Sequence, residues 1–419
     1  MNDPKKKKIL ILGGASVHCK LVRSAKQMGL YTIVTDYLED SPAKKIADKS
    51  YIFDVNDVES IVRMCRSEGV DAVISTHLDP CQRPYQKICQ QLGLPCFGTA
   101  EQYFKLTDKH AFKQMCMENG VDVIPEYTRQ DVENGTVPYP VFIKPVDSRG
   151  SRGQSVCYNT EQALKAIDFA CSESSNGDIL IEKYMAGADE VQITYFMVNG
   201  KAYLVRTVDS HRGEERDGLE KVVLCSVSPS KYTAEYLEDA HHKVVAMIQR
   251  LGIQNGPVFM QGFYDNGKFR FFDPGLRFPG VDYEEIFRKV YAIDLPGLAM
   301  QFALNGRFDQ VVLPEDGALL SGKYAAVLFP TITAGKIASI DGVEALCADE
   351  RVISYLHRHF AGEEIGWTRD VNQRLAEVDI LCENLDELRE MILKVWNTLD
   401  VRDVDGRQML MQKGATVAY

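Results

Sequence analysis

Short apolar runs alternate with helical segments through the first hundred residues, and this alternation restricts the fold more than any other feature of the chain. Four such runs predict strands, at residues 8–14, 31–36, 50–54 and 72–76. Helical periodicity occupies residues 17–28 and 58–68 between them. Apolar strands that alternate with helices are typical of a parallel, doubly wound sheet. Residues 1–100 are therefore predicted to form an open α/β domain.

The ends of these strands predict a place for a ligand, because doubly wound sheets bind small molecules at their carboxyl edge. Gly13, Thr76 and His77 lie at this edge. For His77, a hydrogen-bonded loop histidine is the favoured alternative. The pair Gly13-Gly14 lacks the G-x-G-x-x-G spacing of a dinucleotide site, and no G-x-x-x-x-G-K-[ST] motif of a P-loop NTPase occurs.

The rest of the chain predicts two further units. The second unit opens with a helix and two strands, at 104–119, 141–144 and 179–184. Two hairpins follow, with Asn-Gly turns at 199–200 and 266–267. Further helices are predicted at 161–171, 234–252 and 384–399. We predict a central α+β domain at 101–310 and a small C-terminal α+β domain at 311–419.

The composition excludes several classes of partner. A formal net charge of −11 offers no basic field for nucleic acid. No run of eighteen apolar residues occurs, so no membrane span is expected, and the short apolar run at 9–12 argues against a signal peptide. The eleven cysteines include no C-x-x-C pair, which favours reduced thiols and a cytoplasmic location.

A strand that ends in lysine is followed directly by a glycine-rich loop. Lys144 follows the apolar residues 141–143. The loop contains Ser148, Arg149, Gly150, Ser151, Arg152 and Gly153. Glycine allows successive N–H groups to converge on an anion, and the two arginines add positive charge, so the loop suits a polyphosphate. While the segment is taken alone, an ordinary hairpin turn is an equal alternative.

Three further motifs stand in a fixed order around this loop. They consist of Thr107-Asp108-Lys109 with the later Gly120 and Pro125, of Glu182 and Glu190 around Gly187, and of Gln261, Asp273 and Arg277. In this order the motifs resemble those of the ATP-grasp superfamily, in the branch that contains carbamoyl-phosphate synthase, biotin carboxylase and the purine-pathway ligases. The resemblance covers nearly the whole chain.

This resemblance implies an ATP-grasp central domain whose lid subdomain lies near 128–208. Lys109 and Lys144 are then expected at the phosphates of ATP, and the glycine loop is expected to close over the triphosphate and exclude water. The strand that ends at Lys183 and Tyr184 is expected to lend backbone groups to adenine.

The resemblance also implies roles for two acids and a histidine. Glu182 lies near the adenine base and Glu190 accepts the ribose hydroxyls; a solvated charge at a strand end is the alternative for each. His211 is expected near the phosphates, with a solvated loop as an equal alternative. For Lys109 the alternative is a surface lysine in the first turn of a helix, a position that the helix dipole disfavours.

Gln261 and Asp273 occupy the places of the family's Mg²⁺ ligands, and Mn²⁺ is a second candidate ion. The family pattern E-x-N-x-R reads Asp-Pro-Gly-Leu-Arg here, so Gly275 removes one ligand. A water can replace that ligand, since Mg²⁺ readily keeps waters, or an acid within 282–285 can. An asparagine at 275 is expected to restore the ligand if the backbone accepts a side chain. Arg277 is retained and is expected to stabilise the transferring phosphoryl group or the acyl phosphate.

The activity that the resemblance implies is that of an ATP-dependent ligase, which activates a carboxylate as an acyl phosphate for attack by an amine or similar nucleophile. Its partners would be a small carboxylate and a small amine, and a homodimer stays open because relatives are often dimers. Since Gly275 alters the metal site, the alternative is a nucleotide-binding protein with changed or lost catalysis. A biotin carboxylase-like component would need a carrier elsewhere, because no A-M-K-M motif occurs in the chain.

Overall fold

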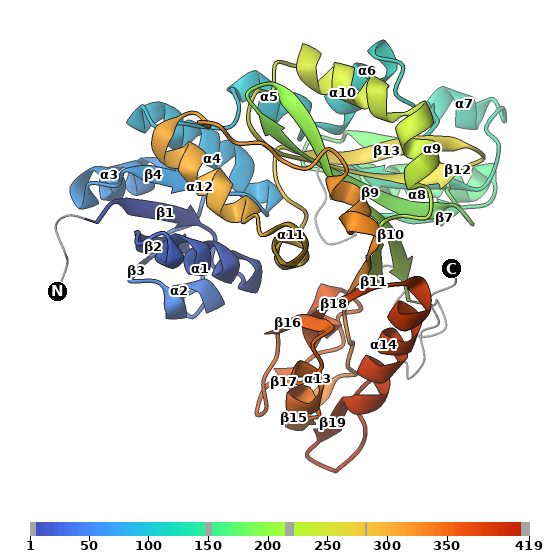
Figure 1. The fold of residues 1–419 in the computed structure, drawn as a ribbon. Helices are drawn as coiled ribbons and strands as arrows, with labels where there is room; N and C mark the ends of the chain where they lie inside the picture. The colour runs from blue at the N-terminus through green and yellow to red at the C-terminus, as the bar shows by residue number, and fades with distance from the viewer. Residues whose placement is uncertain (1–5, 147–152, 214–221, 281–282, 412–419) are drawn as a thin grey trace.

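The computed structural model describes residues 6–146, 153–213, 222–280 and 283–411. Within these residues the chain forms three units: an N-terminal unit, a central unit with the longest strands, and a C-terminal unit (Figure 1). Five of the loop residues singled out from the sequence lie outside the described residues: Ser148, Arg149, Gly150, Ser151 and Arg152. None of the described helices is long and apolar enough to cross a bilayer.

The N-terminal unit is a four-stranded parallel sheet, as the alternation of strands and helices predicts. Its strands, in spatial order, are β3 (Lys49–Ile52), β2 (Tyr31–Asp36), β1 (Lys8–Leu12) and β4 (Ala72–Ile74). Its helical segments are η1 (Ser16–His18), α1 (Cys19–Gln27), α2 (Pro42–Ile46), α3 (Val58–Glu68) and α4 (Asp79–Leu92). Helices lie on both faces of the sheet, which explains why β1 and β4 are almost wholly apolar and buried. The predicted doubly wound fold is confirmed.

Two helices connect this unit to the central one, where the sequence predicts a single helix at 104–119. They are α5 (Ala100–Lys105) and α6 (Lys109–Glu118). The side chain of Asp108 accepts a hydrogen bond from the N–H of Ala111 at 2.9 Å. Such an N-cap starts a new helix at the next residue, so the predicted single helix is wrong and Lys109 opens α6.

A small antiparallel sheet forms one part of the central unit. Its strands, in spatial order, are β5 (Glu126–Tyr127), β8 (Ile179–Lys183), β6 (Val141–Pro145) and β7 (Ser155–Cys157). Two helices pack on it, α7 (Arg129–Glu133) and α8 (Thr160–Glu173). These elements fall within or next to the 128–208 segment expected to form a lid, whereas the chain from residue 189 onward pairs into a larger sheet.

An antiparallel sheet of eight strands runs through the central and C-terminal units. In spatial order its strands are β13 (Lys268–Gly275), β12 (Gly256–Asp265), β9 (Asp189–Val198), β10 (Lys201–Arg212), β11 (Val223–Ser228), β14 (Tyr324–Leu328), β18 (Ala376–Cys382) and β16 (Val352–His357). The two predicted hairpins, β9–β10 and β12–β13, are confirmed. Asn199 (φ 49°) and Gly200 (φ 83°) adopt the left-handed conformation that a two-residue turn of this type requires, and so does the turn at 266–267.

The remaining elements complete the central and C-terminal units. Residues 234–252 form two helices instead of the predicted one, α9 (Thr233–Asp239) and α10 (His241–Arg250). The C-terminal unit adds η3 (Gly317–Gly322), β15 (Gly335–Asp341), α13 (Val343–Cys347), β17 (Glu364–Ile365), η4 (Val371–Gln373), α14 (Leu385–Thr398) and β19 (Asp400–Asp403). α14 matches the helix predicted at 384–399 and packs against β14 and β18 around the buried Trp396.

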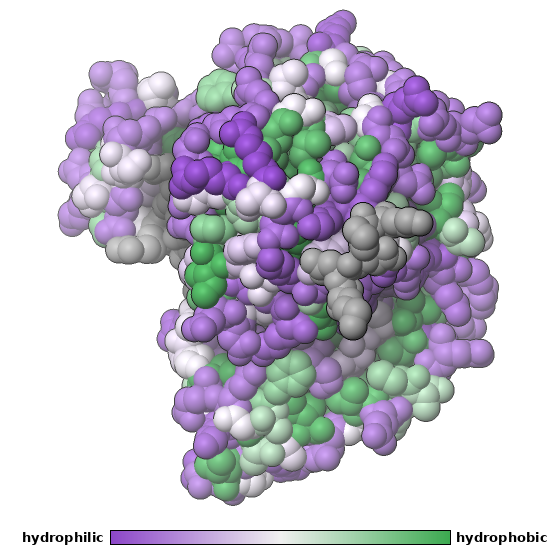
Figure 2. All heavy atoms as spheres, turned by 90° about the vertical axis from the view of Figure 1, so that its left-hand side faces the viewer, coloured by the Kyte–Doolittle hydropathy of each residue, from purple (hydrophilic) through white to green (hydrophobic). Residues whose placement is uncertain are grey.

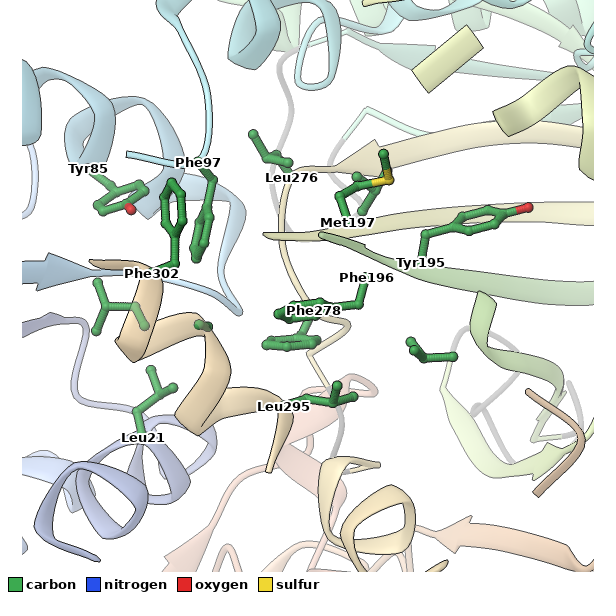
Figure 3. Packing of buried hydrophobic residues seen from close by; sticks show 14 of the residues in the cluster. Leu21, Tyr85, Phe97, Tyr195, Phe196, Met197, Leu276, Phe278, Leu295 and Phe302 are labelled. Carbon is green, nitrogen blue, oxygen red and sulfur yellow. The ribbon is translucent and has the colours of Figure 1, made fainter. Parts of the chain in front are cut away.

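One apolar core joins the N-terminal and central units. α11 (Glu284–Tyr291) and α12 (Leu295–Asn305) return toward the N-terminal sheet, and α12 lies against α1 and β4. Figure 3 shows Phe302 stacked on Phe97, with ring centroids 5.1 Å apart, and Phe196 near Phe278, at 6.0 Å. On the face that Figure 2 shows, hydrophilic side chains cover most of the surface and apolar ones form separate patches.

A buried polar cluster lies between the N-terminal sheet and α11. The Glu284 carboxylate forms an ion pair with Lys20 and lies 3.5 Å from His77 Nε2. His77 Nδ1 shares a hydrogen bond with the Thr76 hydroxyl at 2.9 Å, and His18 packs edge-on against the His77 ring. Burial lowers the pKa of His18 to about 3 and that of His77 to about 4, so both are neutral at pH 7.

We expect these two histidines to destabilise the protein as the pH falls below about 6.5. An unfolded histidine binds its proton near pH 6.5, whereas His18 and His77 bind theirs in the folded protein only near pH 3 and 4. The unfolded state therefore binds more protons between these limits. Each histidine should lower the free energy of unfolding by about 1.4 kcal/mol between pH 7.5 and 5.5, measured by urea denaturation.

A variant with His18→Gln and His77→Gln should show a flatter dependence of unfolding free energy on pH over this range. His242→Gln, which changes an exposed histidine, is the matched control and should leave the dependence as in the wild type. An unchanged slope in the double variant would contradict the assignment of acid sensitivity to this cluster.

Candidate active site

Polar side chains from four neighbouring strands share one face of the eight-stranded sheet. Residues that pair directly across antiparallel strands point to the same side. Gln261 pairs with Asp273 on one side and with Gln192 on the other, and Glu190 pairs with Ser210. The hairpin β12–β13 therefore places the two expected metal ligands side by side on this face.

Glu190 joins several of these side chains into a network. Its buried carboxylate accepts a hydrogen bond from Gln261 Nε2 at 2.6 Å and another from Arg212 Nε at 2.6 Å. Glu190 is therefore a buried, hydrogen-bonded acid, and the alternative of a solvated charge at a strand end is wrong. A ribose hydroxyl that reached this carboxylate would bind next to Gln261 and compete with its amide.

Lys144 and Glu182 form a buried ion pair between neighbouring strands of the small sheet. Lys144 Nζ lies 2.7 Å from Glu182 Oε2, and Lys113 of α6 pairs with the same carboxylate. Burial alone would raise the pKa of Glu182, but Lys144 and Lys113 outweigh it, and the pKa lies below its usual value. Glu182 is thus an ionised, buried acid. Lys113, one turn after Lys109 on α6, was not identified from the sequence.

Asp273 lies within electrostatic reach of several cations. Burial and the neighbouring Asp79 carboxylate raise the pKa of Asp273 above its usual value. The positive charges that oppose this rise come from Arg277, Lys109 and Lys144. Lys144 also lies near this strand, because its Nζ atom is 5.8 Å from the centroid of the neighbouring Phe272 ring.

Arg277 ties this site to the N-terminal unit. Its Nε and Nη2 donate to the two carboxylate oxygens of Asp79, at 2.5 and 2.8 Å, and its Nη1 donates to the carbonyl of Phe278 at 3.0 Å. Arg277 Nη2 lies 3.9 Å from Asp273 Oδ2. Asp79 is the first residue of α4, so a helix of the N-terminal unit orients the arginine expected to stabilise the reacting groups.

Gly275 leaves the room that the Arg277 side chain occupies. A Cβ atom at position 275 would lie 2.8 Å from Arg277 Cγ and 2.9 Å from Arg277 Nε. The φ angle of Gly275 is not in the left-handed region, so its backbone permits a side chain but the space around it does not. An asparagine introduced here would have to displace Arg277 before it could act as a ligand.

The backbone groups expected to contact adenine are partly engaged within the protein. The N–H groups of Lys183 and Tyr184 donate to the carbonyls of Pro125 and Pro140, at 2.9 and 3.0 Å. The Lys183 ammonium pairs with Asp265 at 2.8 Å. These two N–H groups are therefore not available to a base in this structure.

The last predicted residues lie at the edges of the site. His211 lies on β10 opposite Cys225, and its pKa is lowered by burial, against the opposing effect of Asp209. It is therefore not a solvated loop residue. Gly153, the one described residue of the glycine loop, has a φ of 71° and lies against Pro145 at the end of β6.

The acids proposed as substitutes for the missing ligand have other partners. Glu284 pairs with Lys20, and Glu285 pairs with Arg288. Asp282 lies outside the described residues. The two described acids are therefore already paired with cations of the protein.

Comparisons with known proteins identify the family and the fold. A model of the ATP-binding domain of the carbamoyl-phosphate synthase L chain matches residues 108–271, and a model of a PylC-like N-terminal domain matches residues 9–81. The chain is a member of the ATP-grasp superfamily. Two solved structures have the same fold over nearly the whole chain. One is phosphoribosylglycinamide synthetase from Anaerococcus prevotii, with a TM-score of 0.76 and 16% identity over 95% of this chain and 100% of that one. The other is the biotin carboxylase domain dimer of Hydrogenobacter thermophilus 2-oxoglutarate carboxylase with MgADP and bicarbonate, with a TM-score of 0.77 and 19% identity over 97% of this chain and 91% of that one.

Two curated ATP-grasp relatives are similar over part of their length. The 2-oxoglutarate carboxylase small subunit of Hydrogenobacter thermophilus is 26% identical over 218 residues, which are 47% of this chain and 46% of the relative. The formate-dependent phosphoribosylglycinamide formyltransferase of Bacillus subtilis is 24% identical over 256 residues, 59% and 64% of the two chains. The chain thus spans about half to two thirds of the length of the curated relatives it matches.

Replacing Lys144 with methionine should weaken binding of MgADP by about 10- to 100-fold, because a hydrogen bond to a charged group contributes about 1.5–3 kcal/mol. Methionine keeps the apolar part of the side chain, and Lys113 still neutralises Glu182, so the fold should persist. Titration calorimetry measures the affinity. Lys165→Met, at an exposed lysine of α8, is the control, and an affinity unchanged by Lys144→Met would remove Lys144 from the site.

Both Gly275→Ala and Gly275→Asn should disturb Arg277, because the conflict arises at the Cβ atom. We expect the two variants to lose a similar amount of stability in thermal unfolding, and we expect Gly275→Asn to bind Mg²⁺ no more tightly than the wild type. Binding of Mg²⁺ by Gly275→Asn at least tenfold more tightly, without the same gain in Gly275→Ala, would contradict this expectation. It would show that Arg277 is displaced more easily than its pair with Asp79 indicates.

Proposed function

We propose that this ATP-grasp protein is an ATP-dependent ligase that phosphorylates a carboxylate and then transfers the acyl group to an amine, with release of phosphate. The observation that carries the proposal is that Asp273 lies 3.9 Å from Arg277 and is within the electrostatic influence of Lys109 and Lys144. Transfer of a phosphoryl group depends mainly on positioning and on neutralising charge, and these four side chains supply both. No nucleophilic serine or cysteine is required.

Each of these side chains would have a separate role in the reaction. Lys144 and Lys109 neutralise the phosphates of ATP, and Glu182 holds Lys144 in place through their ion pair. Arg277, fixed by Asp79, stabilises the charge of the acyl phosphate. Once the phosphate leaves, the carbonyl carbon is bonded to the nitrogen of the amine, and that nitrogen has lost one proton to the surroundings.

The donor set fits a hydrated magnesium ion. Gln261 and Asp273 lie side by side and Glu190 adjoins Gln261, so two or three protein oxygens face one place. In the part of the chain that the structure describes, no three His, Cys, Asp or Glu side chains form a closed metal cluster. Mg²⁺ commonly retains waters and binds substrate phosphates as well, and Mn²⁺ uses the same ligands. When bound, the ion would draw charge from the phosphates of ATP.

Named activities of relatives support the proposal. Solved structures with this fold include L-amino acid ligase from Bacillus licheniformis (TM-score 0.76, 17% identity) and N5-carboxyaminoimidazole ribonucleotide synthetase from Thermotoga maritima (TM-score 0.69, 16% identity). We extend to this chain a small carboxylate and a small amine as substrates. We also propose a homodimer, by analogy with the biotin carboxylase domain dimer, and a cytoplasmic location, which fits the eleven free cysteines.

A second candidate function is nucleotide binding without ligase chemistry. It is favoured by Gly275, which provides no metal ligand, and by the pair between Arg277 and Asp79, which occupies two of the nitrogen atoms of the guanidinium. A screen for ADP release with Mg²⁺, ATP and pairs of carboxylates and amines separates the two. ADP release that requires both substrates supports the ligase, whereas tight ATP binding without ADP release from any pair supports the alternative.

Asp273→Asn should reduce magnesium-dependent ADP release by at least about 100-fold, because it removes the charge that faces the metal while leaving the size of the side chain unchanged. Binding of ADP without magnesium should stay within about twofold. Asp309→Asn, at an exposed aspartate, is the control for the substitution itself. Normal turnover by Asp273→Asn would place the metal site elsewhere.

A further inference from the structure

Arg206 on β10 is a buried arginine without an acid partner. Its side chain is 1% exposed, and no carboxylate of a described residue lies within 4 Å of the guanidinium. One hydrogen bond is present, from Nη1 to Gln192 Oε1 at 3.1 Å. Within the described ranges, Nε and Nη2 meet no acceptor.

These two nitrogens form the edge of a guanidinium that grips a carboxylate with two parallel hydrogen bonds. Arg277 uses the same pair, Nε and Nη2, to hold the two oxygens of Asp79. Arg206 therefore has the same pair of donors, a fork formed by Nε and Nη2, and no oxygen atom of the described residues accepts a hydrogen bond from either.

Arg206 is held in a fixed orientation. Gln192 engages one end of the guanidinium, and the Tyr283 ring lies beneath it, with its centroid 5.1 Å from Arg206 Cζ. The Tyr283 hydroxyl donates in turn to the carbonyl of Val205, at 2.9 Å. A rigid, oriented fork recognises a planar anion better than a mobile one, because less entropy is lost on binding.

The fork belongs to the face that carries the proposed active site. Arg206 pairs across the strands with Thr194, and Gln192, its hydrogen-bond partner, pairs with Gln261. β10 lies three strands from β13, and Arg206 is two residues along β10 from Val208, which is in register with Asp273. At about 4.8 Å per strand and 3.4 Å per residue, the Arg206 backbone is roughly 16 Å from that of Asp273. This separation suits a second group on a substrate whose reacting end lies at Asp273.

The guanidinium remains charged despite its burial. Burial lowers the pKa of Arg206 to about 10, with Tyr283, Glu284 and Asp379 opposing the shift, so it is protonated at neutral pH. A buried cation without a contacting anion destabilises a fold. An anionic ligand would supply the missing partner. The polar atoms Thr194 Oγ1 and Ser226 Oγ, also without partners among the described residues, lie on the same face.

We propose that Arg206 binds, through Nε and Nη2, a free carboxylate on one of the two substrates, separate from the carboxylate that is phosphorylated. This inference rests on the proposed ligase function. It assigns the substrates to a narrower class: either the amine is an amino acid, or the activated compound is a dicarboxylic acid.

Thermal unfolding of the full chain tests the site without turnover. We expect 10 mM succinate, but not the neutral diamide succinamide at equal ionic strength, to raise the unfolding temperature of the wild type by about 2 °C. Arg206→Met should unfold at a higher temperature without ligand, because the unpaired charge is gone, and should not respond to succinate. Arg206→Lys, which keeps the charge but not the fork, should lose most of the response, and the exposed control Arg307→Met should behave as the wild type.

Turnover tests separate the two sources of the carboxylate. ADP release is compared for alanine against alaninamide, and for succinate against succinamate, each with a range of co-substrates. Arg206→Met should raise the KM of whichever acid the wild type uses by about 100-fold, with little change in kcat, and should not affect its amide. Equal succinate responses in wild type and Arg206→Met, or no response in the wild type, would overturn the Arg206 site. Absence of ADP release from every pair, with the thermal response intact, would instead count against the ligase function.

Discussion

The ladder of hydrogen bonds that runs from β13 to β16 is the interaction on which the rest of the structure depends. Because paired residues in antiparallel strands point to the same side, its register decides which side chains meet. Gln261, Asp273, Glu190 and Arg206 come from four strands, and the register brings them to one face. The same ladder continues through β11 and β14 into the C-terminal unit, so the floor of the site and that unit are one sheet.

The other walls of the site are attached to this sheet by two different kinds of contact. The N-terminal unit shares an apolar core with the central unit around Phe278, and adds a charged pair through Asp79 and Arg277. The small sheet contributes Lys144 and Glu182, bound to Lys113 of α6. Charged pairs therefore cross both boundaries, and at the boundary with the N-terminal unit an apolar core accompanies them.

Local signals in the sequence were sufficient for much of this arrangement. Asn-Gly turns located both hairpins, and the spacing of Gln261 and Asp273 about one of them placed these residues side by side. The prediction of a single helix from periodicity was wrong at Asp108, because this residue caps the start of a second helix. In the C-terminal unit only α14 was predicted as a separate element, since its short strands carry little pattern.

Residues that act across long sequence distances could not be recognised. Arg206 stands in an ordinary apolar and polar alternation, and only the fold shows that its charge is enclosed. Asp79 reads as the start of a helix, and nothing near it in the sequence indicates a partner almost two hundred residues away. The role of a carboxylate or a guanidinium is ambiguous until its neighbours in space are known, because the sequence does not specify which charged groups form pairs.

The space beside Gly275 makes the effect of a substitution at this position depend on the side chains around Arg277. A side chain there conflicts with the present course of Arg277, and that course is held by Asp79. The effects of substitutions at positions 275, 277 and 79 should therefore not add. An asparagine at 275 would therefore be accommodated only together with a change at 79 or 277 that releases the arginine side chain, so the three positions are expected to vary as a set.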